Sequence, residues 1–378
     1  MAKVALGIDL GTTNTVVAKD GAVMPIHHDK LVSKLLPSCV SYMVNGAVLV
    51  GAAAKRRATI DPENAICAAK RVIGRTRAAD LSEYLKRYPS KLETDKTHGC
   101  VFKTRAGAIS PVDVAVEIMR TAVQGAGLRP EDVCAVITVP AAFEEHQRQA
   151  TKTAGVRAGF DAVEILEEPV ATAIGHRANK DQGIADVYDI GGGTFDLAVM
   201  DCKLWPIGII DHGGDLFLGG DDFDEAIAAH CAATLLMQHH WDLRADKAAF
   251  FRLVQEAEKA KVRFSHDSEA TIALDQVAPG NPTGMTSLHL DRADLARCLY
   301  NLVRRTFRTC DEVFERIDMT PLQVDTVFLA GGATQLPILR EWVVTYFGVE
   351  PSLEVSPFEA VARGASLVAK EVFNKRLG

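Results

Sequence analysis

Two short stretches place acidic residues beside glycine-rich turns: "IDLGTTNT" at 8–15 and "YDIGGGTFD" at 188–196. In each, an aspartate (Asp9 or Asp189) ends an apolar run and is followed by glycine and threonine. A glycine turn exposes successive backbone N–H groups and lets the chain approach a phosphate closely. The two stretches therefore have the residue types of a phosphate-binding site.

An aspartate next to a phosphate is repulsive unless a countercharge is present. Its occurrence at both turns predicts a divalent cation, for which Mg²⁺ held through water is the simplest choice. A single turn of this kind also fits a plain tight hairpin, and that interpretation stays open for either turn taken alone. Neither turn is a Walker A loop, because no Lys follows in the GK[ST] pattern, and neither opens a helix as a dinucleotide site does.

Both turns lie between alternating apolar residues that predict strand, turn and strand. The two aspartates are 180 residues apart (189 minus 9), and so long a period indicates duplicated domains. Each half continues with a strand and alanine-rich helices, such as "EEPVATAIG" in the first and "FEAVARGAS" in the second. Strands alternating with helices favour a mixed α/β fold with covered sheets, in two lobes with a cleft between them.

Each predicted lobe has an inserted subdomain that fits the repeat poorly. The predicted division is lobe I at 1–182, with core 1–37 and 110–182 and insert 38–109, and lobe II at 183–378, with core 183–220 and 301–378 and insert 221–300. In the first insert, Asn45-Gly46 predicts a hairpin. The second contains a long helical stretch followed by "EATIALDQV", which we interpret as a strand.

The composition is that of a globular protein, with 48% hydrophobic and 24% charged residues. A net charge of −7 gives no electrostatic reason to expect nucleic acid or an anionic membrane as a partner. The eight cysteines form no CxxC and no metal-ligand pattern with histidine, so we interpret them as buried thiols of a reducing compartment. The absence of a signal-peptide pattern or a membrane-length apolar run predicts a cytoplasmic location.

Taken together, the motifs resemble the nucleotide-binding domain of the 70-kilodalton heat-shock chaperones of DnaK type, in the actin, sugar-kinase and heat-shock superfamily. The matching stretches are "GIDLGTTNT" at 7–15, "AKRVIGR" at 69–75, "VITVPAAFEEHQRQATKTAG" at 136–155, "EEPVATAI" at 167–174, "YDIGGGTFDLAV" at 188–199, "LGGDDFD" at 218–224, "EKAKVRFS" at 258–265 and "VFLAGGATQLP" at 327–337. The resemblance implies a two-lobed actin-like ATPase fold of duplicated ribonuclease-H-like domains.

This resemblance implies slow hydrolysis of ATP, with ATP or ADP and Mg²⁺ as cofactors and K⁺ as a further candidate ion. Lys70 would reach the γ-phosphate, while Asp9, Asp189 and Glu168 would order the hydrated Mg²⁺ and the attacking water, a division of labour that suits phosphoryl transfer. A lysine in a basic run such as Lys70-Arg71 is otherwise commonly a solvated surface charge. The phosphate-loop residues implied are Gly11, Thr12, Thr13, Asn14, Gly191, Gly192, Gly193 and Thr194, and Thr194 is also placed with the catalytic residues.

The resemblance also assigns the adenosine site. The residues implied are Gly220, Asp221, Glu258, Lys261, Ser265, Gly331, Gly332 and Gln335. The family commonly has an arginine at the position of Gln335 that stacks on adenine, and glutamine has no cationic plane. Ala142 replaces a usual tyrosine, and Phe358 replaces a usual aspartate. From Gln335 we expect weaker adenine affinity or weaker base selectivity than is usual in the family.

Partners are also implied by the resemblance. A nucleotide-exchange factor is expected, and a J-domain co-chaperone would approach the strand before Glu168. Bacterial members usually have a basic residue where this chain has Glu164, and the reversed charge should penalise an unmodified J-domain contact. We expect a monomer that binds neither nucleic acid nor membrane.

The leading interpretation is the ATPase domain of a heat-shock 70-type chaperone, acting as a nucleotide switch. One alternative is a nucleotide-binding scaffold or regulator with weak hydrolysis, and a small-molecule kinase of the same superfamily is another. The family's interdomain linker and peptide-binding domain do not follow Gly378, so we expect either a piece of a longer chaperone or a short homologue. "LKRYP" at 85–89 favours the branch that serves iron–sulfur cluster assembly.

Overall fold

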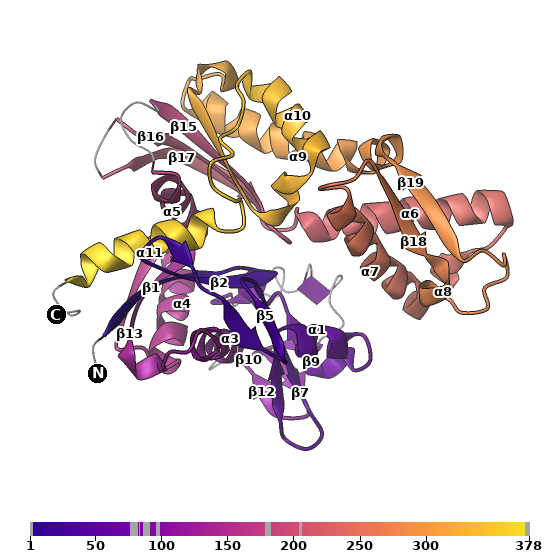
Figure 1. Cartoon of the computed structure of the whole chain (residues 1–378), viewed down its shortest axis with the longest axis horizontal. Helices are drawn as coiled ribbons and strands as arrows, with labels where there is room; N and C mark the ends of the chain where they lie inside the picture. Colours follow the sequence, from indigo (N-terminus) through magenta and orange to yellow (C-terminus); the bar gives the residue numbers. More distant parts are fainter. Residues whose placement is uncertain are drawn as a thin grey trace.

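The computed structural model describes residues 3–75, 82, 84–85, 91–95, 99–177, 183–203 and 206–374. Figure 1 shows two bodies, one drawn from indigo to magenta and the other from pink to orange, with the yellow C-terminal helix lying between them. Each body is built on a sheet of its own. The predicted lobe boundary at residue 182 and the predicted motif "LKRYP" beyond Leu85 lie outside the described residues.

The first sheet has the strand order β14-β13-β1-β2-β3, and β6 pairs with β2. Strands β1 and β2 form the antiparallel hairpin around the first glycine turn, while β13 runs parallel to β1. All seven residues of β13 are buried, as expected for a parallel strand with both faces covered. The strands are β1 (Val4–Leu10), β2 (Asn14–Lys19), β3 (Ala22–Val23), β6 (Leu36–Pro37), β13 (Val133–Val139) and β14 (Ala162–Glu167).

The second sheet repeats this arrangement with the order β17-β16-β15-β20. Strands β15 and β16 form the antiparallel hairpin around the second glycine turn, and β20 runs parallel to β15 as β13 runs parallel to β1. The predicted strand–turn–strand pattern is thus confirmed at both turns. The strands are β15 (Ile184–Ile190), β16 (Phe195–Asp201), β17 (Gly208–Asp215) and β20 (Thr326–Ala330).

Helices cover both faces of each sheet, and two of them meet between the sheets (Figure 1). Helix α11 (Ala360–Val372) packs on the first sheet, α5 (Glu168–Gly175) packs on the second, and the two helices lie against each other. A Cβ at Gly364 would lie 1.7 Å from the Ala171 carbonyl oxygen, so only glycine allows this approach. The outer faces carry α3 (Pro111–Gly125) and α4 (Glu145–Arg157) on the first sheet and α9 (Arg292–Arg316) and α10 (Pro337–Phe347) on the second.

The remaining elements fill the regions predicted as inserts, apart from one hairpin that precedes them. The Asn45-Gly46 turn joins β7 and β8 as predicted. "EATIALDQV" was predicted as one strand, but it ends as a helix, because the chain turns at Ala273 and Leu274 starts α8. The elements are β4 (Ile26–His28), β5 (Leu31–Ser33), β7 (Cys39–Tyr42), β8 (Val48–Val50), α1 (Ala52–Ala58), β9 (Ala65–Cys67), β10 (Lys91–Asp95), β11 (Gly99–Thr104), β12 (Gly107–Ile109), α6 (Gly220–His239), α7 (Lys247–Arg263), β18 (Glu269–Ala273), α8 (Leu274–Val277) and β19 (Ser287–Asp291).

The interpretation of all eight cysteines as buried thiols is wrong for three of them. Cys39 and Cys67 form a disulfide, and Cys298 is the one of the six free cysteines that is only half-buried. The pair escapes a search for short sequence spacings because its members are 28 residues apart and are brought opposite each other by the pairing of β7 with β9. The disulfide is therefore a consequence of sheet register.

Asp186 is a carboxylic acid in the middle of β15, on the same face as Tyr188. Its side chain is fully buried, and neither carboxyl oxygen has a hydrogen-bond partner among the described residues. Burial raises the pKa of Asp186 well above its usual range. The folded protein therefore keeps this acid protonated at pH values where the unfolded chain releases the proton.

Because the folded form holds the extra proton, the contribution of Asp186 makes the protein less stable as pH rises above the ordinary pKa of an aspartic acid near 4. We expect Asp186→Asn to remove this contribution. As pH rises in this range, the difference in free energy of unfolding between Asp186→Asn and the wild type should change in favour of the variant by up to about 1.4 kcal/mol per pH unit. Urea unfolding between pH 5 and pH 8 measures it, with exposed Asp267→Asn as the control. Parallel stability curves for wild type and Asp186→Asn would contradict the assignment.

Candidate nucleotide site between the two glycine turns

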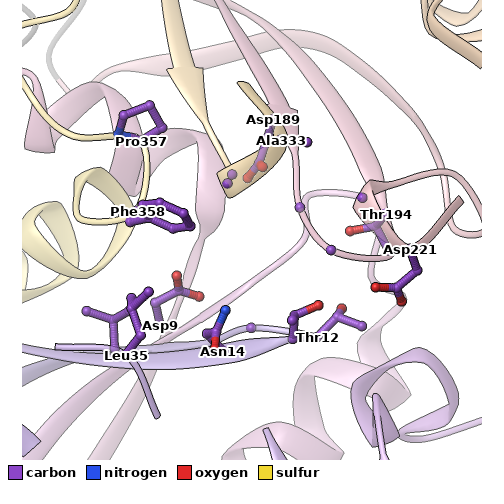
Figure 2. Close-up of a pocket in the computed structure, with 18 of the residues that line it drawn as sticks. Asp9, Thr12, Asn14, Leu35, Asp189, Thr194, Asp221, Ala333, Pro357 and Phe358 are labelled. Carbon is purple, nitrogen blue, oxygen red and sulfur yellow. The ribbon is translucent and has the colours of Figure 1, made fainter. Parts of the chain in front are cut away.

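The two glycine turns, which are far apart in the sequence, touch in the structure. A Cβ at Gly192 would lie 1.6 Å from the Thr13 hydroxyl oxygen, so a side chain at this position would push the two sheets apart. Within the second turn, the Gly191 N–H donates to the Thr194 carbonyl oxygen at 3.0 Å and closes the loop. Figure 2 shows Asp9 and Asp189 on the two sides of the pocket between the turns.

The start of α6 lies on the second turn. The N–H groups of Gly220 and Asp221 donate to the carbonyl oxygens of Gly191 and Gly192, at 3.0 and 2.6 Å. Lys261 of α7 donates to the Gly220 carbonyl oxygen at 2.7 Å and to Asp224 at 2.8 Å. These hydrogen bonds attach α6 to the second glycine turn and α7 to the start of α6.

Four carboxylates lie next to the glycine turns and close to one lysine, Lys70. They are Asp9, Glu168, Asp189 and Asp196. Lys70 forms an ion pair with Glu168, and both side chains are about nine-tenths buried. Burial and the neighbouring Glu168 charge raise the pKa of Asp9 to about 7. Burial, with the charges of Glu168 and Asp196, raises the pKa of Asp189 well above its usual range. Asp196 shows the same effect, its pKa being raised to about 7 by burial and by Glu168.

These raised pKa values, caused first by burial and then by mutual repulsion, mean that the buried carboxylates do not all ionise easily beside the single positive charge of Lys70. Burial acts to lower the pKa of Lys70, but Glu168 and Asp9 raise it overall, so the lysine stays charged. Several carboxylate oxygens therefore lie near only one positive charge, which is an environment suited to a hard divalent cation such as Mg²⁺. Among the described residues, no group of three or more acidic, histidine or cysteine side chains is placed so that it could hold a metal ion directly.

The far end of the pocket is formed by α7 and by an ion pair that crosses the cleft. Lys55 of α1 donates to both carboxylate oxygens of Glu258, at 2.6 and 2.9 Å. Although burial acts to raise the pKa of Glu258, Lys55 and Lys261 lower it overall, so this carboxylate is charged. The ion pair thus joins α1 of the first body to α7 of the second across the pocket mouth.

Most of the residues that the sequence predicted for the site line one cavity. The lining includes Asp9, Gly11, Thr12, Thr13, Asn14, Lys70, Glu168, Asp189, Gly191, Gly192, Thr194, Gly220, Asp221, Glu258, Lys261, Gly331 and Gly332. Gly193, Ser265 and Gln335 are not among the described residues that line it. Gly193 is instead packed against Arg71, whose guanidinium occupies the space that a Cβ would need.

Three residues of the site were not predicted as members of it. Asp224 accepts the hydrogen bond from Lys261. The side chain of Arg71 is fully buried and reaches across the cleft to Asp221 at 3.3 Å and to the Leu216 carbonyl oxygen at 3.3 Å. Phe358 faces the pocket, as Figure 2 shows, and packs on Gly332. The motifs "AKR" and "GGDDFD" could have pointed to Arg71 and Asp224, whereas the sequence marked Phe358 only as the replacement of a charged residue.

Glu164, the predicted acidic departure, lies on β14 and is exposed. It accepts a hydrogen bond from Lys152 of α4 at 3.0 Å, so a local ion pair occupies this surface. Nearby, Arg148 donates to Glu167 at 2.8 Å and to the Ala141 carbonyl oxygen at 3.1 Å. The surface next to Glu168 is therefore a set of paired charges without a free basic patch among these residues.

No helix in the described part of the chain is both long enough and apolar enough to cross a membrane.

A family model described as Hsp70 protein matches residues 5–374. The chaperone proteins DnaK of two strains of Thermus thermophilus are each 37% identical to this chain over 377 residues. The matches cover 98% of this chain and 61% of each DnaK, so the chain spans less than two thirds of the length of these relatives.

The match of the family model over nearly the whole chain agrees with the two paired sheets, the crossing helices and the cleft between the glycine turns. This mixed α/β architecture is that of the actin-like ATPase fold, and the chain belongs to the Hsp70 chaperone family.

Proposed function

We propose that the protein binds Mg·ATP between its two glycine turns and hydrolyses the nucleotide slowly, as the switch of a heat-shock 70-type chaperone. The observation that carries this proposal is the contact of the two turns directly beside the buried Lys70–Glu168 pair. One turn alone would be compatible with a hairpin. Two turns in contact form a site that opens or closes as the two lobes move.

The chain's own residues divide the work of phosphoryl transfer. The backbone N–H groups and hydroxyls of the turns would hold the phosphates, and Asp9 and Asp189 would orient a hydrated Mg²⁺, which supplies the positive charge that the cluster lacks. Glu168 would orient the attacking water. Lys70 would stabilise the γ-phosphate, for which it must give up part of its pairing with Glu168. K⁺ is a second ion that the carboxylate and carbonyl oxygens of the site would accept.

The adenosine is proposed to lie against Glu258 and Lys261 on one side and Gly331 and Gly332 on the other. Ser265 and Gln335 stay proposals for this part of the site, since neither lines the cavity. Because Gln335 cannot supply a cationic stacking plane, we propose that adenine is held more weakly than by an arginine. Phe358 adds an apolar face next to Gly332.

A scaffold or regulator that binds nucleotide with weak hydrolysis is the second candidate. The paired surface at Glu164 and the position of Gln335 outside the cavity lining favour it. A small-molecule kinase is the third, and no described feature of the cleft favours it. A cytoplasmic location, a monomeric state and a nucleotide-exchange factor as partner remain parts of the proposal, and assignment to the iron–sulfur branch does too.

Lys70→Ala separates hydrolysis from binding. Removing a charged donor that acts on the transition state should lower the single-turnover rate of ATP hydrolysis by about 100-fold, in the range found for such donors. Affinity for ADP should change little, because ADP has no γ-phosphate. Quenched-flow hydrolysis and calorimetric ADP binding measure the two effects. The surface variant Lys103→Ala is the matched control, and equal hydrolysis rates in wild type and Lys70→Ala would remove Lys70 from the mechanism.

Glu164→Arg tests the J-domain surface. A J-domain whose surface is complementary to a basic residue would be repelled by the acidic Glu164 side chain. A J-domain protein should therefore stimulate the wild-type ATPase little, and Glu164→Arg should increase that stimulation. Steady-state phosphate release with increasing J-domain protein measures this. Glu312→Arg makes the same charge change at an exposed site on α9 and should leave stimulation unchanged. Strong stimulation of the unmodified protein would show that Glu164 is no obstacle.

A further inference from the structure

The Cys39–Cys67 disulfide joins the ends of two strands that flank the nucleotide site. Cys39 is the first residue of β7 and Cys67 is the last residue of β9, and the two are paired in register. Their Cα atoms are 4.2 Å apart, a separation typical of an antiparallel pair that exchanges no backbone hydrogen bonds. At this pair, the disulfide is therefore the direct connection between the strand ends.

The disulfide is reachable from the cleft. Cys39 and Cys67 both line a cavity of about 400 Å³ that lies between α1 and α7 and also touches Thr12 and Thr13 of the first phosphate turn. Cys39 is buried, whereas Cys67 is half-buried. Cys67 is therefore the more exposed residue of the pair, and we expect a small thiol entering the cleft to attack it.

Both ends of the disulfide are connected to catalytic parts of the site. On one side, the N–H of Ser38 donates to the Thr13 carbonyl oxygen at 2.8 Å, and the Ser38 hydroxyl contacts that of Thr15 at 3.0 Å. On the other side, Cys67 is followed by Ala68, with a φ of 54°, and then by the short 3₁₀ helix Ala69–Val72 that carries Lys70. The disulfide thus ties the anchor of the phosphate turn to the segment that positions Lys70.

We propose that Cys39–Cys67 is a site of reversible thiol–disulfide exchange with a dithiol reductant, and that its redox state sets how firmly Lys70 is held beside the phosphate turn. The catalytic consequence rests on the proposed ATPase function, whereas the redox chemistry and the change in local order do not. We expect the region to stay folded on reduction, because the hydrogen bond that the Tyr84 hydroxyl donates to the Cys67 carbonyl oxygen at 2.7 Å does not involve the disulfide.

The exchange is balanced by the two thiols of the reductant. One thiolate attacks Sγ of Cys67, forms a mixed disulfide and releases the Cys39 thiolate, which takes up a proton. The second thiolate of the reductant then attacks the reductant's sulfur in the mixed disulfide and releases the Cys67 thiolate, which also takes up a proton. Two electrons pass to the protein, which gains two thiols, and the reductant leaves as a disulfide.

The other cysteines do not compete for this chemistry. Burial raises the pKa of Cys202 and Cys298 to about 11 and that of Cys100 and Cys231 to about 12. Burial likewise raises the pKa of Cys310 well above its usual value. These thiols stay protonated near neutral pH and are poor nucleophiles. Five of the six free cysteines are therefore not expected to attack the disulfide or to react with the reductant's disulfide.

The first test uses no nucleotide. Oxidised and dithiothreitol-reduced wild type are compared by hydrogen exchange of peptides covering residues 68–75, with thiols counted by mass after removal of the reductant and alkylation in denaturant. The expected result is six alkylated cysteines before reduction, eight after brief reduction under native conditions, and faster exchange at 68–75 only in the reduced form. Eight free thiols in the protein purified without reductant would overturn the proposal. Unchanged exchange at 68–75 after reduction would overturn it too.

The second test measures the catalytic consequence. Single-turnover ATP hydrolysis should fall roughly tenfold on reduction, since a small displacement of a positioned group costs this much or more, while ADP affinity stays nearly constant. Cys67→Ser should have the reduced-form rate with or without dithiothreitol, and Cys298→Ser, at a free cysteine, should respond like the wild type. The melting temperature of Cys67→Ser shows whether it folds, and the wild-type comparison stands if it does not.

The two tests separate the two proposals. Hydrogen exchange at 68–75 could change with redox state while neither form binds ATP. That result would contradict the proposed function but support the thiol–disulfide exchange site. Hydrolysis that is equal in the oxidised and reduced forms, despite a complete change in thiol count, would overturn the coupling to Lys70.

Discussion

The charge balance around Lys70 is the constraint on which the rest of the structure depends. Acidic side chains from both lobes meet there, and burial together with their mutual repulsion raises the pKa values of Asp9 and Asp196 to about 7. A single buried ammonium paired with Glu168 does not neutralise them. Further positive charge in the cleft would relieve this repulsion, and in the proposed function the metal ion of the nucleotide supplies it. Under that proposal, nucleotide binding and closure of the cleft are coupled.

Small residues permit the close approach that this coupling needs. Gly192 contacts Thr13 across the cleft, and Gly364 lies against the Ala171 carbonyl where α5 and α11 cross. At each place a Cβ would overlap atoms of the opposite element. Packing of backbone on backbone lets the two helices turn relative to each other without long side chains interlocking, which suits a hinge. Arg71 and the Lys55–Glu258 pair add polar connections between the same two bodies.

The sequence was sufficient where local pattern and spacing determine structure. The alternation around each turn predicted both hairpins, and the repeat predicted two similar sheets, because strand periodicity and turn glycines are local signals. The Cys39–Cys67 bond was missed because it depends on the register of β7 with β9. Asp224 and the cross-cleft reach of Arg71 depend on how the second body sits on the first. Such information is in the tertiary packing and has no signature in a single segment.

If both turns hold one nucleotide together with a metal ion, nucleotide affinity must depend on that ion. Isothermal titration of the wild type with ADP, in the presence of Mg²⁺ and again in excess EDTA, measures this dependence. We expect one nucleotide bound per chain with Mg²⁺ and an affinity at least about tenfold lower without it, since the carboxylates then repel the phosphates. Binding that is equally tight in EDTA, or no binding under either condition, would contradict it.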